Sequence, residues 1–105
     1  MFERNAMSKT ELFPLIEGTN MSASFGHIFG GGYAAGYYGY KWAEVLDADA
    51  FSYFQEKGIF NKETAASFRK NVLEKGGTEK PSELYRRFRS KDPSIEPLLI
   101  RSGLK

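Results

Sequence analysis

Apolar residues recur at helical spacing along most of this chain, and the pattern predicts helices rather than strands. From about Ala34 to Lys57 the sequence contains no proline and alternates apolar with polar residues at that spacing. Gly58 follows as a residue suited to the left-handed conformation that ends many helices. Strand signals are weak throughout. We therefore expect an all-α fold that contains one long helix over residues 34–57.

Three shorter helices are predicted after the long one, so that the chain forms a small helical domain of about four helices. Asn61 is a good N-cap, and Phe60 before it is positioned to act as a hydrophobic staple. Pro81 opens the next helix, and Ser94 caps a last helix over residues 95–101. The side chains expected to form apolar stripes in the first two of these helices are Ala65, Phe68, Val72, Leu84, Tyr85 and Phe88.

The first 24 residues read as mixed loop, because Pro14, Gly18 and Asn20 act as breakers. We expect an irregular N-terminal stretch over residues 1–17 and one helical domain over residues 18–105. A chain of 105 residues is one ordinary domain or a piece of a larger one.

The long helix has aromatic residues on two sides, although a surface helix needs only one apolar stripe. At 100° per residue, one side carries Tyr38, Trp42, Val45, Leu46 and Tyr53, and the opposite side carries Tyr33, Tyr37, Tyr40 and Phe51. We expect burial from two directions, and self-association of the isolated chain through the surface around Tyr33, Tyr37 and Phe51. Asp49 lies within the first stripe and needs a partner that the sequence does not identify.

Composition narrows the classes of function. The chain has no cysteine, which excludes a disulfide scaffold, a thiolate zinc site and a cysteine nucleophile. No apolar run approaches the roughly 18–20 residues of a membrane span, and the start lacks a signal peptide's apolar block, so we expect a cytoplasmic protein with no membrane partner. A net charge of +2 is a weak footprint for nucleic acid. The basic run from Arg86 to Lys91 is therefore interpreted as a solvated helix flank.

Residues 25–42 are rich in glycine and tyrosine and contain the single histidine, His27. The spacing of Gly30, Gly32 and Ala35 fits a dinucleotide-binding pattern, but the flanking strands that this motif needs are not predicted. Three consecutive glycines, Gly30, Gly31 and Gly32, cost backbone entropy and need a reason. A mobile loop that approaches a substrate is one such reason.

Tyr33 and Tyr40 follow these glycines seven residues apart, which on a helix is two turns, or about 10 Å along one face. Two neutral phenol donors in a cleft are suited to holding the oxyanion of a tetrahedral intermediate. The spacing alone favours the alternative that both tyrosines are ordinary core or surface residues. His27 has no second histidine with which to form a zinc site, and the chain contains no self-sufficient catalytic constellation.

The segment FGHIFGGGYAAGYYGYKWAEVLDADAF, residues 25–51, closely resembles the C-terminal end of the thimet-oligopeptidase-like family of zinc metallopeptidases. The preceding GTNMSASFGH and the downstream KGIFNKETAASFRKNVLEKGGTEKP and LYRRFRSKDPSIEPLLIRSGL are also similar to that family. The resemblance covers residues 18–104, and residues 1–17 show no clear match.

The resemblance implies that this chain is the C-terminal part of a large helical peptidase that cleaves short peptides. It assigns oxyanion or substrate hydrogen bonding to Tyr33 and Tyr40, substrate contact to His27, and a flexible loop to Gly30, Gly31 and Gly32. The resemblance also implies zinc in the parent enzyme. Because the family's His-Glu-x-x-His zinc helix is absent from this sequence, we expect this chain alone to bind no zinc and to be inactive without the missing N-terminal catalytic portion. The alternative is a stand-alone helical module that binds peptide or protein without catalysis.

Overall fold

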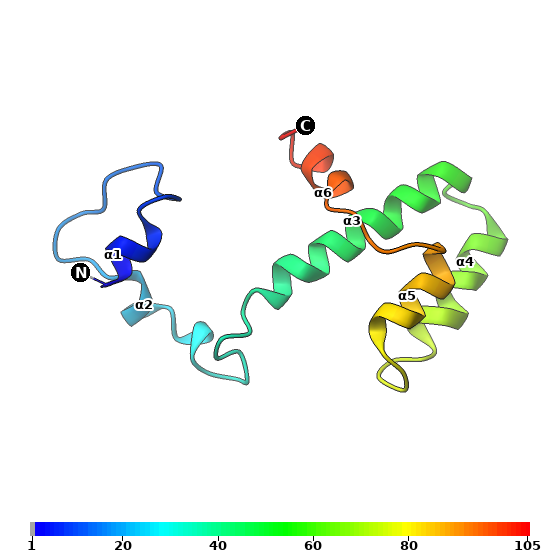
Figure 1. The fold of residues 1–105 in the computed structure, drawn as a ribbon, viewed down its shortest axis with the longest axis horizontal. Coiled ribbons are helices and arrows are strands. Elements are labelled where there is room, and N and C mark those ends of the chain that lie inside the picture. Colours follow the sequence, from blue (N-terminus) through cyan, green and yellow to red (C-terminus); the bar gives the residue numbers. More distant parts are fainter. Residues whose placement is uncertain (1) are drawn as a thin grey trace. The chain divides into compact units, whose positions relative to one another are not determined.

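The computed structural model describes residues 2–105, and the regular secondary structure in that range is entirely helical, with no strand (Figure 1). The predicted all-α class is confirmed, with six α-helices in the described range rather than about four. The helices are α1 (Phe2–Met7), α2 (Met21–Ser24), α3 (Gly39–Lys57), α4 (Lys62–Phe68), α5 (Pro81–Arg89) and α6 (Glu96–Arg101), with the 3-10 helix η1 (Gly26–Ile28) and the π-helix η2 (Arg69–Leu73). The chain divides into two compact units, which end and begin at Gly39 and Tyr40.

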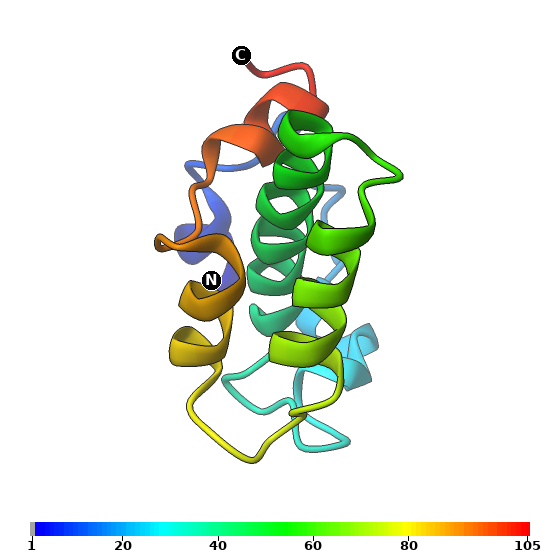
Figure 2. The ribbon, with the colours of Figure 1, turned by 90° about the vertical axis from the view of Figure 1, so that its right-hand side faces the viewer.

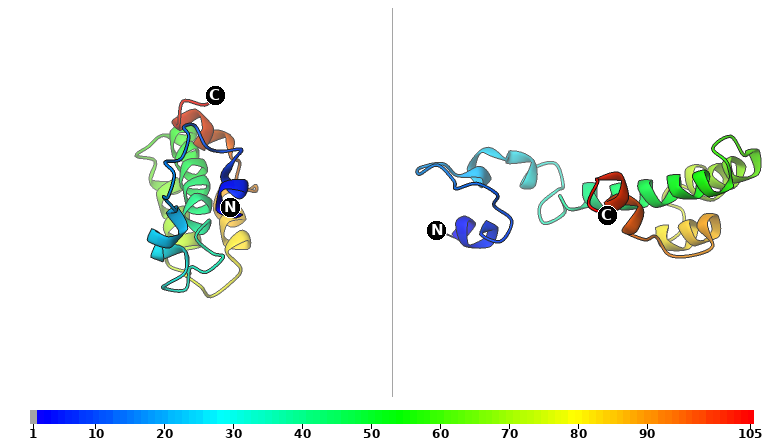
Figure 3. Two further views of the ribbon diagram at one scale, coloured as in Figure 1. Left: turned by 90° about the vertical axis from the view of Figure 1, so that its left-hand side faces the viewer. Right: turned by 90° about the horizontal axis from the view of Figure 1, so that it is seen from above.

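In the first unit, α1 and α2 are short helices separated by a long loop (Figure 3). The Glu3 carboxylate accepts hydrogen bonds from the backbone N–H groups of Met21 and Ser22, at 2.8 and 3.1 Å. The Asn20 side chain caps α2 by accepting from the N–H of Ala23 at 3.0 Å. The expectation of a loop through residue 24 is therefore wrong at 2–7 and 21–24. Capping and a long-range carboxylate bond stabilise these helices, and neither gives an apolar periodicity.

The second unit has one core, to which α3, the α4–η2 segment and α5 contribute (Figure 2). Ala50, Tyr85 and Phe88 form its buried centre. The centre of the Phe88 ring lies 5.0–6.1 Å from the centres of four other aromatic rings, mostly edge to face. Such pairs stabilise a core beyond the apolar area that they bury. The partly buried side chains packed around this centre are Leu46, Tyr53, Phe54, Phe68 and Val72.

Helix α3 begins at Gly39, five residues later than the predicted start at Ala34. Ala35 has a φ of +54°, which a right-handed helix cannot contain, and the chain turns through bonds from the N–H of Gly36 to the carbonyl of Tyr33 and from the N–H of Gly39 to that of Gly36. The predicted end at Lys57 is correct, with Gly58 at a φ of +101°. The predicted aromatic stripes therefore exist only from Tyr40 onward.

The predictions for the shorter helices are confirmed for the face of α5, whose three expected apolar side chains are all buried, and hold only in part for the other two helices. Asn61 caps α4 by accepting from the N–H of Thr64 at 2.9 Å, as expected. Phe60, however, is 96% exposed and does not act as a staple, and Thr64 takes the buried position predicted for Ala65. The last helix starts one residue later than expected, so its N-cap is Ile95 and the predicted cap at Ser94 is wrong. The Ser94 hydroxyl still accepts a hydrogen bond from the N–H of the first helical residue at 3.2 Å.

Asp49, whose partner the sequence did not identify, is the most deeply buried side chain of this core, at 1% exposure. Its carboxylate accepts hydrogen bonds from the Tyr85 hydroxyl at 2.6 Å, from Nε of Arg89 at 3.1 Å and from the backbone N–H of Ser94 at 3.2 Å. Burial, followed by the bond to Asp49, raises the pKa of the Tyr85 phenol. The guanidinium of Arg89 also pairs with Glu56 at 3.0 Å. This network joins α3, α5 and the segment that leads to α6.

Candidate functional site

The glycine-rich loop follows η1 directly, and its backbone requires glycine at two of the three predicted positions. Gly31 and Gly32 have φ values of +66° and +82°, in the left-handed region that L side chains rarely adopt. A Cβ added at Gly31 would lie 3.4 Å from the ring of Tyr33. Gly30 has no such constraint on φ, and its N–H bonds to the carbonyl of Gly26 at 2.9 Å. The loop therefore folds the chain back against the Tyr33 ring.

His27 and Tyr33, which the sequence proposed as site residues, lie in direct ring contact. Their centroids are 4.6 Å apart with the planes at 82°, an edge-to-face arrangement. Tyr37 lies beside both, at 5.4 Å from His27 and 6.5 Å from Tyr33, and it also packs at 4.8 Å against Phe25. These four residues form an aromatic cluster next to the glycine loop.

Tyr37, a member of this cluster, was predicted only as part of an aromatic side of the long helix. The pattern Tyr33-x-x-x-Tyr37 suits one face of a helix, but here the chain between these two residues forms non-helical turns. The density of aromatic residues around His27 was the available signal, and it would have pointed to a ring cluster without giving its geometry.

Tyr40 lies in the first turn of α3 and is 45% exposed. Tyr33 lies six residues before that helix begins, so the premise that the two phenols occupy one helix face two turns apart is wrong. Each tyrosine belongs to a different compact unit of the chain. That both phenols face one cleft stays a prediction based on the family resemblance.

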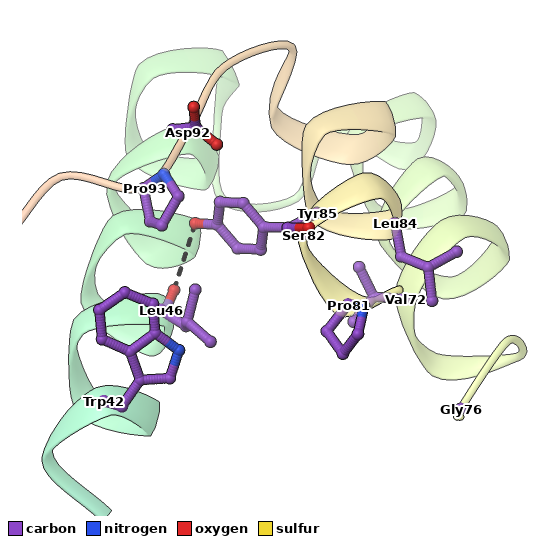
Figure 4. A pocket seen from close by; sticks show the side chains of 10 residues that line it. All are labelled: Trp42, Leu46, Val72, Gly76, Pro81, Ser82, Leu84, Tyr85, Asp92 and Pro93. Carbon is purple, nitrogen blue, oxygen red and sulfur yellow. Dashed lines mark hydrogen bonds between the residues drawn. The ribbon is translucent and has the colours of Figure 1, made fainter. Parts of the chain in front are cut away.

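A groove in the second unit lies between α3 and α5 and has a volume of about 350 Å3 (Figure 4). Its walls are mostly apolar, and the Trp42 side chain is 58% exposed. The Tyr85 hydroxyl in the wall bonds to the carbonyl of Leu46 at 3.3 Å as well as to Asp49. The lining residues are Trp42, Leu46, Val72, Gly76, Pro81, Ser82, Leu84, Tyr85, Asp92 and Pro93.

The arginines of the basic run are paired within the chain. Arg86 bonds to Asp92 at 2.7 Å and Arg87 to Glu79 at 2.6 Å, and these carboxylates raise the pKa of both guanidinium groups. Both lie at the surface, as a solvated flank should. Arg89 does not fit that interpretation, because it is buried against Asp49. The phosphate-binding capacity of the run is thus reduced by internal carboxylates.

Residues 2–105 lack the features of a metal centre, a dinucleotide site and a membrane span. No group of three or more histidine, cysteine, aspartate or glutamate side chains lies close enough to hold a metal ion in this range. Over the same residues no strand precedes the Gly30-x-Gly32 pattern, so its dinucleotide interpretation lacks its structural context. None of the described helices combines the length and apolar character that crossing a bilayer requires.

Fold and site together define a helical segment that presents a tight glycine loop, an aromatic cluster and an exposed tyrosine at a helix start. The family model described as peptidase family M3 matches residues 2–104, including most of the first 17 residues, for which the sequence analysis found no clear match. This chain belongs to peptidase family M3, which confirms the resemblance to the thimet-oligopeptidase-like enzymes.

Individual relatives agree with this assignment. Oligopeptidase A of Escherichia coli is 56% identical over 82 residues, which cover 78% of this chain and 12% of the relative. The probable cytosolic oligopeptidase A of Arabidopsis thaliana is 49% identical over 100 residues, 91% of this chain and 14% of the relative. Dipeptidyl carboxypeptidase of Escherichia coli is 41% identical over 104 residues, 98% of this chain and 15% of the relative. The chain thus spans 12–15% of the length of these relatives.

Proposed function

We propose that this chain is the C-terminal, substrate-positioning and oxyanion-stabilising part of a zinc-dependent oligopeptidase or peptidyl-dipeptidase that hydrolyses short peptides. The match to peptidase family M3 over residues 2–104 is the observation that carries the proposal. The relatives named for oligopeptide cleavage and for dipeptide release are both similar to this chain, so the substrate class is short peptides in either case. The cytoplasm is the proposed location, which suits a chain without cysteine.

In this proposal the phenols of Tyr33 and Tyr40 donate hydrogen bonds to the scissile carbonyl as it becomes an oxyanion. A phenol ordinarily keeps its proton at pH 7, so it is available as a hydrogen-bond donor. It can therefore stabilise the negative charge that develops on the carbonyl oxygen only in the transition state. His27, whose ring packs edge to face with that of Tyr33, contacts the substrate. Gly30, Gly31 and Gly32 let the backbone of the loop approach the peptide, since no side chain stands between.

The zinc ion of the parent enzyme is proposed to be held by the missing N-terminal catalytic portion. The residues of this chain do not fit a zinc site, because it has one histidine, no cysteine and, over residues 2–105, no cluster of potential ligands. This segment therefore contributes binding and hydrogen bonding, and the attacking water is activated elsewhere in the enzyme.

The test of the proposed role is Tyr40→Phe in the whole enzyme. Loss of an oxyanion donor should lower kcat by about 10²–10³-fold and change KM little, because the bond strengthens only in the transition state. The control is Tyr38→Phe, which removes the hydroxyl of an exposed tyrosine two residues earlier and should leave both constants unchanged. An unchanged kcat for Tyr40→Phe would return that residue to a packing role.

A second prediction concerns the 105-residue chain alone, which should not hydrolyse peptides. Residues 2–105 contain no cluster of metal ligands, so we expect no bound metal ion that would activate water at neutral pH. The assay uses a quenched fluorescent short peptide with added zinc, and no turnover above the peptide-only blank is expected. Turnover that a chelator abolishes would contradict the prediction, because this chain would then contain a metal site of its own.

A further inference from the structure

The groove between α3 and α5 is lined mostly by apolar side chains, and two of its polar side chains already form hydrogen bonds within the chain. The carboxylate of Asp92 at its edge is held by Arg86 at 2.7 Å, and the Tyr85 hydroxyl is directed to Asp49 at 2.6 Å. Figure 4 shows the tyrosine ring spanning the groove, with Trp42 and Leu46 on one side and Pro81 and Leu84 on the other. A charged ligand would find little to bond with, whereas apolar side chains would replace water at favourable free energy.

From this arrangement we propose that the groove is a docking surface for an apolar stretch of the upstream polypeptide of the same protein. The inference rests on the proposed function, under which this chain is the C-terminal part of a longer enzyme. The segments matched here make up 12% and 15% of these relatives, so most of the polypeptide that could cover the groove lies outside this chain. A volume of about 350 Å3 is at the small end of the range for ligand pockets and accommodates a few side chains.

The upstream polypeptide is a stronger candidate than a second copy because it is covalently continuous with the groove. A tethered segment acts at an effective concentration of the order of millimolar, which a free protein at cellular concentration does not reach. A second copy would therefore be displaced in the whole enzyme.

Docking at the groove would also fix the helix that carries Tyr40. Trp42 lies two residues after Tyr40 on α3, which is about 3 Å along the helix axis. A segment packed on Trp42 and Leu46 would hold the first turns of α3 from the outside, while Ala50 and Asp49 hold its middle from the core. Packing at the groove would thus set the position of Tyr40 relative to the rest of the enzyme.

The experiment compares the accessibility of the groove in the isolated chain and in a full-length chimera. The chimera joins the N-terminal part of Escherichia coli oligopeptidase A to this chain, in place of the segment that the chain matches. Because this chain has no cysteine, Ser82→Cys supplies one thiol in the groove, and Ser102→Cys supplies an equally conservative control outside it. Both serines are exposed in the structure. Maleimide labelling is followed by mass spectrometry of the peptide that contains each residue.

The expected result is that the labelling rate at residue 82 falls at least about tenfold in the chimera relative to the isolated chain, because reaction then requires local opening. The rate at residue 102 should change much less. Equal labelling of residue 82 in both proteins would overturn the inference, and so would equal protection of residue 102. Protection of residue 82 in the isolated chain that grows with protein concentration would assign the groove to a second copy, which also overturns it.

Hydrolysis of a short peptide by the unsubstituted chimera separates this inference from the proposed function. An active chimera with an unprotected residue 82 would refute the docking surface and leave the proposed function in place. A chimera in which residue 82 is protected, but which binds zinc and does not cleave peptide, would refute the proposed function and leave the docking surface in place.

Discussion

Asp49 and Arg89 form a buried ion pair that could be a liability, since taking two charges out of water costs several kcal/mol per ion. Here the cost is offset by additional bonds. Asp49 accepts from the Tyr85 hydroxyl and the Ser94 N–H, and Arg89 bonds to Glu56 and lies 4.6 Å from the centre of the Tyr53 ring. The pair is therefore satisfied on both sides, and removing one member would leave the other buried without compensation.

We predict that Asp49→Ala destabilises the chain by about 3–5 kcal/mol, the cost of breaking a buried pair from one side. Asp47→Ala is the matched control, because Asp47 lies two residues earlier on α3 and pairs with Arg101 at the surface. Exposed pairs contribute about 0–1 kcal/mol, so the control should change stability little. Urea unfolding followed by circular dichroism measures both, and loss of the helical signal at 25 °C before urea is added counts as the same outcome for Asp49→Ala. Equal effects of the two substitutions would contradict the importance of the network.

The sequence showed that Asp49 needed a partner but could not name it. Arg89 lies 40 residues away along the chain, and the pairing depends on how α5 packs against α3, which no local pattern encodes. His27 and Tyr33 were proposed as site residues only through the family resemblance, and that assignment stays a prediction, because a lone histidine and a tyrosine spacing were compatible with ordinary packing. The contribution of Tyr37 to the aromatic cluster was not predicted, because ring packing within turns produces no periodic pattern in the sequence.

At the scale of elements, helix ends were predicted where a local rule decides them. The Asn61 cap and the stop at Gly58 each depend on a few neighbouring residues, and both are present. The start of α3 was misplaced because residues 34–38 have a helical pattern but form turns, with Gly36 and Gly39 lowering helix propensity and Ala35 at positive φ. In these turns the rings of Tyr33 and Tyr37 pack against the ring of His27, a contact that the helical pattern does not predict.

The bond between Glu3 and the start of α2 gives a pH-dependent element. The Ser22 hydroxyl, followed by the N–H groups of Ser22 and Met21, lowers the pKa of Glu3 below its ordinary value of 4.5. A lowered folded-state pKa means that the carboxylate stabilises α2 fully above about pH 4.5, and that this is lost as pH falls through the lowered value. We expect the amide resonances of Met21 and Ser22 to shift in that acidic range in an NMR titration. Glu3→Gln should abolish the shift and Glu17→Gln should retain it, and a titration unaffected by Glu3→Gln would contradict the assignment.

For the whole molecule, the large number of exposed apolar side chains is the dominant fact. The aromatic surface that was expected to drive self-association included Tyr33, Tyr37 and Phe51. Of these, Tyr33 and Tyr37 are half-buried in the ring cluster, whereas Phe51 is 47% exposed on α3. Phe51 lies with Pro97 and Ile100 along a second, smaller groove between α3 and α6. Phe51 and its neighbours are therefore the part of that surface available for contact between copies.

We predict that the isolated chain self-associates through the surface around Phe51, and that Phe51→Ser raises its dissociation constant by about tenfold or more. Burying a phenylalanine side chain contributes roughly 1.5–3 kcal/mol, and each 1.4 kcal/mol is a factor of ten in the constant. Trp42→Ser is the control, because nine residues at 100° each place Trp42 on the opposite side of α3. Sedimentation equilibrium over a concentration series measures both constants. A purely monomeric chain at high concentration, or an equal effect of the two substitutions, would show that this surface does not bind a second copy.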